Sequence, residues 1–333
     1  MRFLLTLLFI SPLLAETPIT TFACGSCYKV GRDKAHIFQT IAKDKPQAFL
    51  FMGDNIYADT YDAKVMKEKY DRLINSPDYA AFSKETPIIP IWDDHDYGVN
   101  DAGREYPMKE KSAELFFEAF KFPADHEARK TPGVYHSRIM GPEGQRTQFI
   151  MLDTRSFRSK LVKQKIKSRQ TYIPQTDEEA TILGETQWTW LKKELEKKAE
   201  LRVIVSSIQV IANEHRFEKW QNMPNERTRF INLLKEASSG PTILLSGDRH
   251  LAEVNVFKKE NTPLDFDLYE MTSSGMTHGS AFNDPLTTRV AGTYSRAKNY
   301  GVVDIDWSGE KPSLELKIKG VTGEVFSTTK VTF

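Results

Sequence analysis

The sequence has almost no net charge and no bias toward glycine or proline. In 333 residues, 46 Lys and Arg balance 45 Asp and Glu to within one charge, and there are 18 Gly and 16 Pro. This composition excludes a disordered chain, a collagen-like fibre and a coiled coil. A formal charge of +1 creates no global field that attracts nucleic acid or an anionic membrane. We therefore expect no nucleic-acid-specific partner, and any anion must bind at a local site.

Long apolar runs are absent after the first fifteen residues. Residues 1–15, MRFLLTLLFISPLLA, place Arg2 before an apolar run, which Ser11 and Pro12 interrupt and Ala15 ends. The run is much shorter than the about 20 residues that a membrane-spanning helix needs. It predicts a signal peptide, so we expect a secreted or periplasmic protein without a stable membrane anchor.

Cysteine is scarce, and the two that occur are Cys24 and Cys27. In an exported protein, two cysteines normally form one disulfide. A bridge between residues three apart closes a very small loop and adds little stability. The surrounding FACGSCY also lacks the helix start of a thioredoxin-like redox motif. Metal ligation therefore stands beside a disulfide as an interpretation of this pair.

Short apolar runs recur along the chain, with helical patterns between them. Six runs are typical of strands buried on both faces: 19–23, 48–52, 88–92, 147–152, 201–206 and 241–245. Five segments have helical periodicity: 32–43, 63–75, 109–120, 185–198 and 226–237. Strands that alternate with helices predict an α/β layered fold. Because the sequence has no internal repeat and no long linker, we expect residues 16–333 to form a single domain.

The C-terminal part has a different pattern, with alternating polar and apolar residues. The segments are 254–257, 265–271, 300–306, 313–318 and 325–333. We expect antiparallel strands that form a second sheet there. The basic stretch 158–169 has no interleaved aromatic residues, which favours a solvated excursion over a nucleic-acid patch.

Side chains able to bind metal follow four of the predicted strands. The segments are Cys24–Cys27, Asp54–Tyr57, Asp93–Asp96 and Asp248–His250. Because ligands of open α/β sheets bind at the carboxyl ends of strands, we expect the four segments to converge on one place. The other histidines have no partner at ligand spacing and are expected to be exposed or merely hydrogen-bonded: His36, His126, His136, His215 and His278.

The segment Asp93–Asp96 carries three carboxylates in four residues. These repel one another at a buried strand end unless a cation neutralises them, which favours a multivalent metal ion. Asp54 and Tyr57 are three residues apart and can reach one ion from a tight loop, and a phenolate ligand favours a ferric centre. Asp248 and His250 are two residues apart and point the same way from an extended chain.

Six segments occur in order along the chain: GDNIYAD (53–59), WDDHDYGVNDAG (92–103), LDTRSFRS (152–159), LGETQWTWL (183–191), VSSIQV (205–210) and SGDRH (246–250). Together they resemble the PhoD-type alkaline phosphatase family of metallophosphoesterases. The resemblance implies an α/β layered metallophosphoesterase sandwich with two central mixed β-sheets flanked by helices. It also implies a binuclear site with Fe3+ and Ca2+. The sequence departs from the longer members in lacking their additional N-terminal domain, so we expect a minimal, single-domain relative.

The resemblance implies a role for each matching residue. Its metal ligands are Cys27, Asp54, Tyr57, Asp94, Asp248 and His250, with Cys27 rather than Cys24 on iron and Asp54 as the bridging carboxylate. Its substrate contacts are Asn55, where longer members carry a larger or basic residue, and Asp93. It also implies that His95 faces the phosphate. By their positions in the chain, Arg249 between two of these ligands and Arg155 after a predicted strand are further catalytic candidates. For the two arginines, bidentate phosphate binding and a structural salt bridge to a local carboxylate are equally open.

These implications predict a metal-dependent phosphoric ester hydrolase whose partner is a small phosphate ester. Two metal ions would clamp the phosphoryl oxygens and lower the pKa of a bound water, and His95 would assist the leaving group. A phosphodiesterase or phospholipase-type hydrolase with the same site is one alternative. A metal-binding protein that has lost catalysis is the other, and the complete motif set argues against it.

Overall fold

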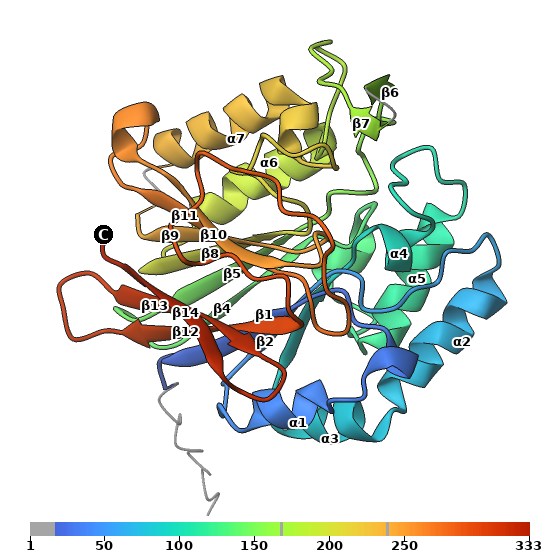
Figure 1. Ribbon diagram of the computed structural model, residues 1–333, viewed down its shortest axis with the longest axis horizontal. Coiled ribbons are helices and arrows are strands. Elements are labelled where there is room, and N and C mark those ends of the chain that lie inside the picture. The colour runs from blue at the N-terminus through green and yellow to red at the C-terminus, as the bar shows by residue number, and fades with distance from the viewer. Residues whose placement is uncertain (1–16, 167–168, 238–239) are drawn as a thin grey trace, which may run out of the picture.

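The computed structural model describes residues 17–166, 169–237 and 240–333, so the predicted signal peptide at 1–15 lies outside the described residues. Two six-stranded mixed sheets stack face to face, with helices on both outer faces (Figure 1). This arrangement confirms the predicted α/β sandwich with two central mixed sheets. In the described ranges, no helix is long and apolar enough to cross a membrane.

The first sheet joins the N-terminal strands to the C-terminal ones, in the order β14-β13-β12-β1-β2-β3. Its strands are β1 (Thr21–Gly25), β2 (Phe49–Met52), β3 (Ile88–Ile91), β12 (Asn299–Asp306), β13 (Ser313–Gly320) and β14 (Val325–Val331). The three N-terminal strands are parallel, and the others pair antiparallel. Four helices pack on this sheet: α1 (Ile37–Ala42), α2 (Ala63–Ile74), α3 (Pro77–Glu85) and α5 (Lys109–Ala119).

The second sheet has the order β10-β11-β9-β8-β5-β4. Its strands are β4 (His136–Met140), β5 (Thr147–Leu152), β8 (Leu201–Ser206), β9 (Thr242–Ser246), β10 (Ala252–Phe257) and β11 (Leu268–Ser273). The four central strands β11, β9, β8 and β5 are parallel, and each edge strand is antiparallel to its neighbour. Helices α6 (Gly184–Leu195) and α7 (Pro224–Glu236) cover its outer face (Figure 1).

Two hydrophobic cores follow from the alternation of side chains along the buried strands. In β5, Phe149 and Met151 join the core shared by the two sheets, whereas Ile150 and Leu152 join the core under α6 and α7. Successive side chains of a strand point to opposite faces, so a continuous apolar run supplies both cores at once. Burial on both faces is the physical reason that the central strands are continuous apolar runs in the sequence.

The prediction that the C-terminal strands form a sheet of their own is wrong. Strands β12–β14 extend the first sheet by pairing β12 with β1, and β10 and β11 extend the second sheet through β9. Alternation of polar and apolar residues identifies a strand and its buried face, but it says nothing about which distant strand is its neighbour. The basic stretch is divided: Arg158 is buried, and beyond it β6 (Lys163–Ile166) and β7 (Arg169–Tyr172) form a two-stranded excursion.

Candidate metal centre

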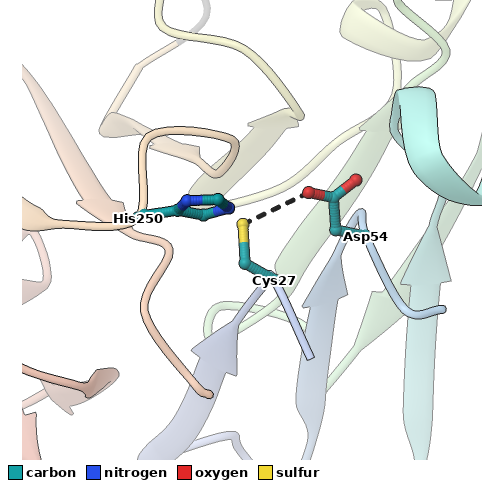
Figure 2. Close-up of side chains that lie close together, drawn as sticks. All are labelled: Cys27, Asp54 and His250. Atoms are coloured by element: carbon teal, nitrogen blue, oxygen red, sulfur yellow. Dashed lines mark hydrogen bonds between the residues drawn. The ribbon is translucent and has the colours of Figure 1, made fainter. Parts of the chain in front are cut away.

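The segments that follow β1, β2, β3 and β9 meet at one edge of the sandwich. Cys27 comes after β1, Asp54 after β2 and His250 after β9, and Figure 2 shows their side chains directed toward one another. After β3, the chain turns at once into the short helix α4 (Asp94–Tyr97), which presents Asp94 and His95. The adjacent parallel strands β1, β2 and β3 end at the same sheet edge, and the stacking of the two sheets brings the end of β9 to it.

Four of the predicted ligands have a backbone conformation that residues other than glycine rarely adopt. Cys27, Asp54, Asp248 and His250 have φ of 59°, 51°, 66° and 54°, in the left-handed region. For residues other than glycine, this region is sparsely populated, and such residues gather at functional sites. Four left-handed residues among the six predicted metal ligands indicate that the loops are shaped to direct these side chains inward.

Two glycines allow the loops to approach closely. A Cβ on Gly53 would lie 2.5 Å from the Cβ of Asp93, and a Cβ on Gly247 would lie 2.8 Å from the carbonyl oxygen of Met52. Both distances are shorter than non-bonded carbon contacts allow. Any side chain at either glycine would therefore push the Asp54 loop away from its neighbours.

A first group of donors surrounds the thiol. Cys27 Sγ lies 3.3 Å from Asp54 Oδ2, and the Tyr57 hydroxyl lies 3.3 Å from the same oxygen and 3.1 Å from His250 Nε2. Ligand atoms of Cys27, Asp54 and His250 all lie within 4.8 Å of one another. Thiolate, phenolate, imidazole and carboxylate together suit a transition metal.

Two further groups overlap with the first in a chain, through Asp54 and then Asp94. Asp54, Asp94 and His95 form one, and Asp93, Asp94 and Asp248 form the other, each with ligand atoms within 4.8 Å. The second is a set of oxygen atoms, the type of donor that hard divalent cations prefer. The structure thus brings together all six residues predicted as metal ligands, and Asp54 and Asp94 each belong to two groups.

Burial disfavours the charged forms of the acidic groups at this site. It raises the pKa of Asp54 and of Asp248 well above the usual carboxyl range, and nearby aspartates reinforce the effect. Burial and the charges of Asp54 and Asp248 also raise the pKa of the Cys27 thiol well above its ordinary value. Buried anionic groups are costly unless they are paired or bind metal. The donor set therefore fits multivalent cations.

His95 is the cation that these carboxylates hold. Burial opposes a charge on its ring, but Asp94, Asp54 and Asp59 raise the pKa of His95 to about 11. Its Nδ1 lies 2.6 Å from Asp59 Oδ1, and its ring packs 4.3 Å from that of Tyr57. Sequence reasoning missed Asp59, although it ends the GDNIYAD segment.

Arg155 and Asp93 lie behind the site and not on its wall. Arg155 Nε donates to Asp93 Oδ1 at 2.6 Å, Arg155 Nη1 donates to Glu218 Oε2 at 2.7 Å, and Arg158 Nε lies 2.8 Å from Glu218 Oε1. The side chains of Arg155 and Asp93 are 0% exposed. The structural salt bridge is therefore the interpretation of Arg155 that the geometry favours, because a sealed and doubly paired guanidinium has no access to substrate.

Asn55 is also turned away from the cavity. Its side-chain amide donates to the carbonyl of Ile91 at 2.8 Å and to Asp96 Oδ2 at 2.5 Å, and the residue is fully buried. These bonds tie the Asp54 loop to the end of β3 and to α4. The expected substrate contact through the Asn55 side chain does not fit this geometry.

His278 lies beside the donors, although sequence reasoning set it aside. Its ring stacks on that of His250 with centroids 5.1 Å apart and planes at 17°, and its Nδ1 is 3.2 Å from the carbonyl of Cys27. No local spacing could have signalled it, because it reaches the site from 28 residues downstream of His250. Cys24 and Cys27 are both free, and Cys24 is fully buried in the core, which excludes the disulfide interpretation.

A cavity of about 460 Å³ opens in front of the donors. Asp94, His95, Asp248 and His250 line it, as do Arg249 and the loop 279–282. This volume is within the range of small-molecule sites, about 300–1,000 Å³. Among the predicted catalytic residues, His95 and Arg249 therefore border the cavity and Arg155 does not.

Comparison with known proteins gives a consistent result. Residues 22–310 match the family model described as PhoD-like phosphatase. The chain is 25% identical over 326 residues to alkaline phosphatase D of Bacillus subtilis (strain 168), a match that covers 85% of the chain and 53% of that protein. The chain thus spans about half the length of this relative.

Two solved structures share the fold. A structure of PhoD superposes with a TM-score of 0.74 at 16% identity, over 96% of this chain and 69% of the other. A purple acid phosphatase from yellow lupin (Lupinus luteus) seeds superposes with a TM-score of 0.60 at 12% identity, over 95% of this chain and 54% of the other. Both similarities confirm the metallophosphoesterase sandwich.

Proposed function

Because the chain belongs to the PhoD-like phosphatase family, we propose that it hydrolyses small phosphate esters at a binuclear metal centre. The observation that carries this proposal is the convergence of six donors from four strand ends on one place, where three of them, Asp94, Asp248 and His250, line the adjoining cavity. Three overlapping donor groups, sharing Asp54 and Asp94, have the arrangement that a pair of neighbouring ions requires.

The donors divide into two chemical types. Cys27, Tyr57 and His250 with one oxygen of Asp54 suit ferric iron, since thiolate and phenolate are anionic and strongly electron-donating ligands. Asp94 and Asp248, with the other oxygen of Asp54, suit calcium, which prefers carboxylate oxygens. When bound, the two ions would polarise the phosphoryl group and lower the pKa of water, so that it attacks phosphorus near neutral pH.

His95 is the proposed proton donor to the departing alcohol. The Asp59 carboxylate keeps a proton on Nδ1 and fixes the orientation of the ring, so Nε2 is the atom that transfers a proton to the leaving oxygen. Bound cations would neutralise Asp54 and Asp94, the groups that raise the pKa of His95 to about 11. That pKa would then fall toward the working pH, where a histidine transfers protons efficiently.

Arg249 and Arg155 have different proposed roles. Arg249 borders the cavity, so its guanidinium can contact a phosphate oxygen there. An ion pair with Asp284, with Nη2 and Oδ2 3.3 Å apart, orients the guanidinium. Arg155 acts as a positioning residue, because its ion pair fixes Asp93 directly before the ligand Asp94.

We also propose export of the protein, supported by the apolar residues 1–15. N-terminal sequencing tests this proposal, and an unprocessed chain found in the cytoplasm would refute it.

Metal analysis combined with turnover tests the proposal. Asp94→Ala should lose metal and activity together, because it removes a ligand. His95→Ala should keep its metals and lose about 10²- to 10⁴-fold in rate on 4-nitrophenyl phosphate or bis(4-nitrophenyl) phosphate, the usual range for proton-transfer assistance. Loss of metal from His95→Ala would instead make it a ligand.

Cysteine variants supply a matched pair for the metal assignment. Cys27→Ala should lose iron, whereas Cys24→Ala, a buried cysteine three residues away outside every donor group, should retain it. Equal iron content in the two variants would contradict the assignment of Cys27. No turnover of either nitrophenyl ester by fully metal-loaded protein would refute the proposed activity.

A further inference from the structure

Two phenylalanines lie on the wall of the cavity. Phe217 and Phe282 both line it, and their ring centroids lie 5.3 Å apart at an angle of 56°. Phe282 is 44% exposed, although it is a large apolar side chain. An exposed ring beside a polar cavity provides a face that a ligand can cover.

Guanidinium groups flank these rings. The Cζ atom of Arg216 lies 4.6 Å from the Phe217 ring and 4.7 Å from the Phe282 ring, and Cζ of Arg249 lies 4.1 Å from the Phe217 ring. We call Phe217, Phe282, Arg216 and Arg249 the aromatic shelf. The shelf combines flat apolar faces with positive charge.

The chain holds the shelf in place. The Tyr294 hydroxyl donates to the carbonyl of Phe282 at 2.6 Å, and the amide of Phe282 donates to Ser280 Oγ at 3.1 Å. Arg289 lies 4.4 Å above the Tyr294 ring and pairs with buried Glu253. Phe282 is therefore a ring on an anchored loop, which lowers the entropic cost of binding a ligand there.

Arg249 connects the shelf to the metal donors. It lies between Asp248 and His250 in the chain, its guanidinium stacks on Phe217, and its side chain is 5% exposed. Within the described residues, Arg249 Nε has no hydrogen-bond partner. A phosphate at the metal centre would supply an acceptor for such a donor, and the group esterified to it would then extend over the shelf.

We propose that the aromatic shelf is a binding subsite for a flat aromatic group on the alcohol or phenol that is esterified to the substrate phosphate, such as an aryl ring or the base of a nucleotide. Aromatic groups stack on both phenyl rings and guanidinium planes, whereas an alkyl chain gains nothing from the two guanidinium groups. The inference rests on the proposed function, because it takes the phosphate to bind at the metal donors.

Binding of phosphonates tests the subsite independently of turnover. Benzylphosphonate and cyclohexylmethylphosphonate carry the same charge and similar bulk, and only the first has a flat ring. Calorimetry on metal-loaded protein should give a dissociation constant about threefold to tenfold lower for the benzyl compound. In Phe282→Leu and Phe217→Leu, the ratio of the cyclohexyl to the benzyl dissociation constant should fall toward one.

The matched control is Phe326→Leu, the same substitution at a 37% exposed ring on β14, remote from the cavity. It should leave the ratio as in the unmodified protein. Equal affinities, or tighter binding of the cyclohexyl compound, by the unmodified protein would overturn the inference, as would an unchanged ratio in both shelf variants.

Turnover of the matching esters separates the two proposals. Benzyl phosphate and cyclohexylmethyl phosphate release alcohols of similar acidity, so their kcat/KM ratio reports the subsite and not the leaving group. A benzyl preference in binding without turnover of any ester would refute the proposed activity and leave the subsite supported. Turnover of both esters at equal kcat/KM, with equal phosphonate binding, would refute the subsite alone.

Discussion

Replacement of Arg155 by methionine tests whether this arginine is structural or contacts substrate. The side chain is 0% exposed and pairs with two carboxylates, Asp93 and Glu218, themselves 0% and 1% exposed. Methionine fills a similar volume without charge. It leaves Asp93 with Ser207 as a hydrogen-bond donor at 2.6 Å and Glu218 with Arg158 at 2.8 Å.

The expected loss is large because the partners stay buried. Removal of one member of a buried ion pair costs about 3–5 kcal/mol. For a chain of this length, each kcal/mol lowers the melting temperature by about 2 °C, so Arg155→Met should melt about 6–10 °C lower. Arg146→Met is the control, because Arg146 and Glu200 are 21% and 28% exposed and an exposed pair contributes at most about 1 kcal/mol.

The loss of melting temperature in Arg155→Met should be greater at high pH than at low pH. Burial raises the pKa of Asp93 to about 7 even though Arg155 lowers it, so loss of Arg155 raises that pKa further. Below pH 7, Asp93 is mostly protonated in both proteins and its ion pair with Arg155 contributes little. Above pH 7, the unmodified protein carries a paired carboxylate, and the variant must bury an unpaired charge or hold a proton. The difference in melting temperature should therefore be greater at pH 8.5 than at pH 5.5.

Thermal melts of metal-free protein in chelator at the two pH values, together with ester turnover by metal-loaded protein at 25 °C, test both expectations. A change in melting temperature below 2 °C together with a hundredfold loss of rate would refute the structural interpretation and indicate that Arg155 contacts the substrate. If Arg155→Met does not fold, Arg155→Lys serves instead. Lysine keeps the charge but cannot bridge Asp93 and Glu218 with a planar fork, so a smaller deficit is expected.

Two further predictions follow from the donor residues. Tyr57→Phe in iron-loaded protein should abolish visible absorption and keep the fold, since phenylalanine fills nearly the same volume without a phenolate; an unchanged spectrum would place the chromophore elsewhere. In metal-free protein, His95 has a folded pKa of about 11 against an ordinary 6.5, so its charge stabilises the fold fully below about pH 6.5 and this stabilisation is lost as pH rises toward 11. The melting temperature of the unmodified protein relative to His95→Gln, measured in chelator, should therefore fall across that range, and a constant difference would contradict the assigned charge.

Local sequence determined the strands and the residues that follow them. Buried parallel strands need apolar side chains on both faces, so runs such as Thr147–Leu152 are visible without tertiary information. The side chains after β1, β2 and β3 could also be assigned to one site, because adjacent parallel strands end at a common edge, whereas β9 lies in the other sheet and joins that site only through the packing of the two sheets. The carboxylates at Asp93–Asp96 indicated a cation through their mutual repulsion alone.

The tertiary structure decided strand partners and the direction of each polar side chain. Whether Arg155 binds phosphate or a carboxylate depends on Glu218, 63 residues away, and sequence spacing does not reveal this neighbour. His278 and Phe282 reach the site on a loop that has no motif of its own. Motifs record contacts between residues close in the chain. Contacts between distant residues arise only when the two sheets pack, and these contacts separate the buried ion pairs from the groups that border the cavity.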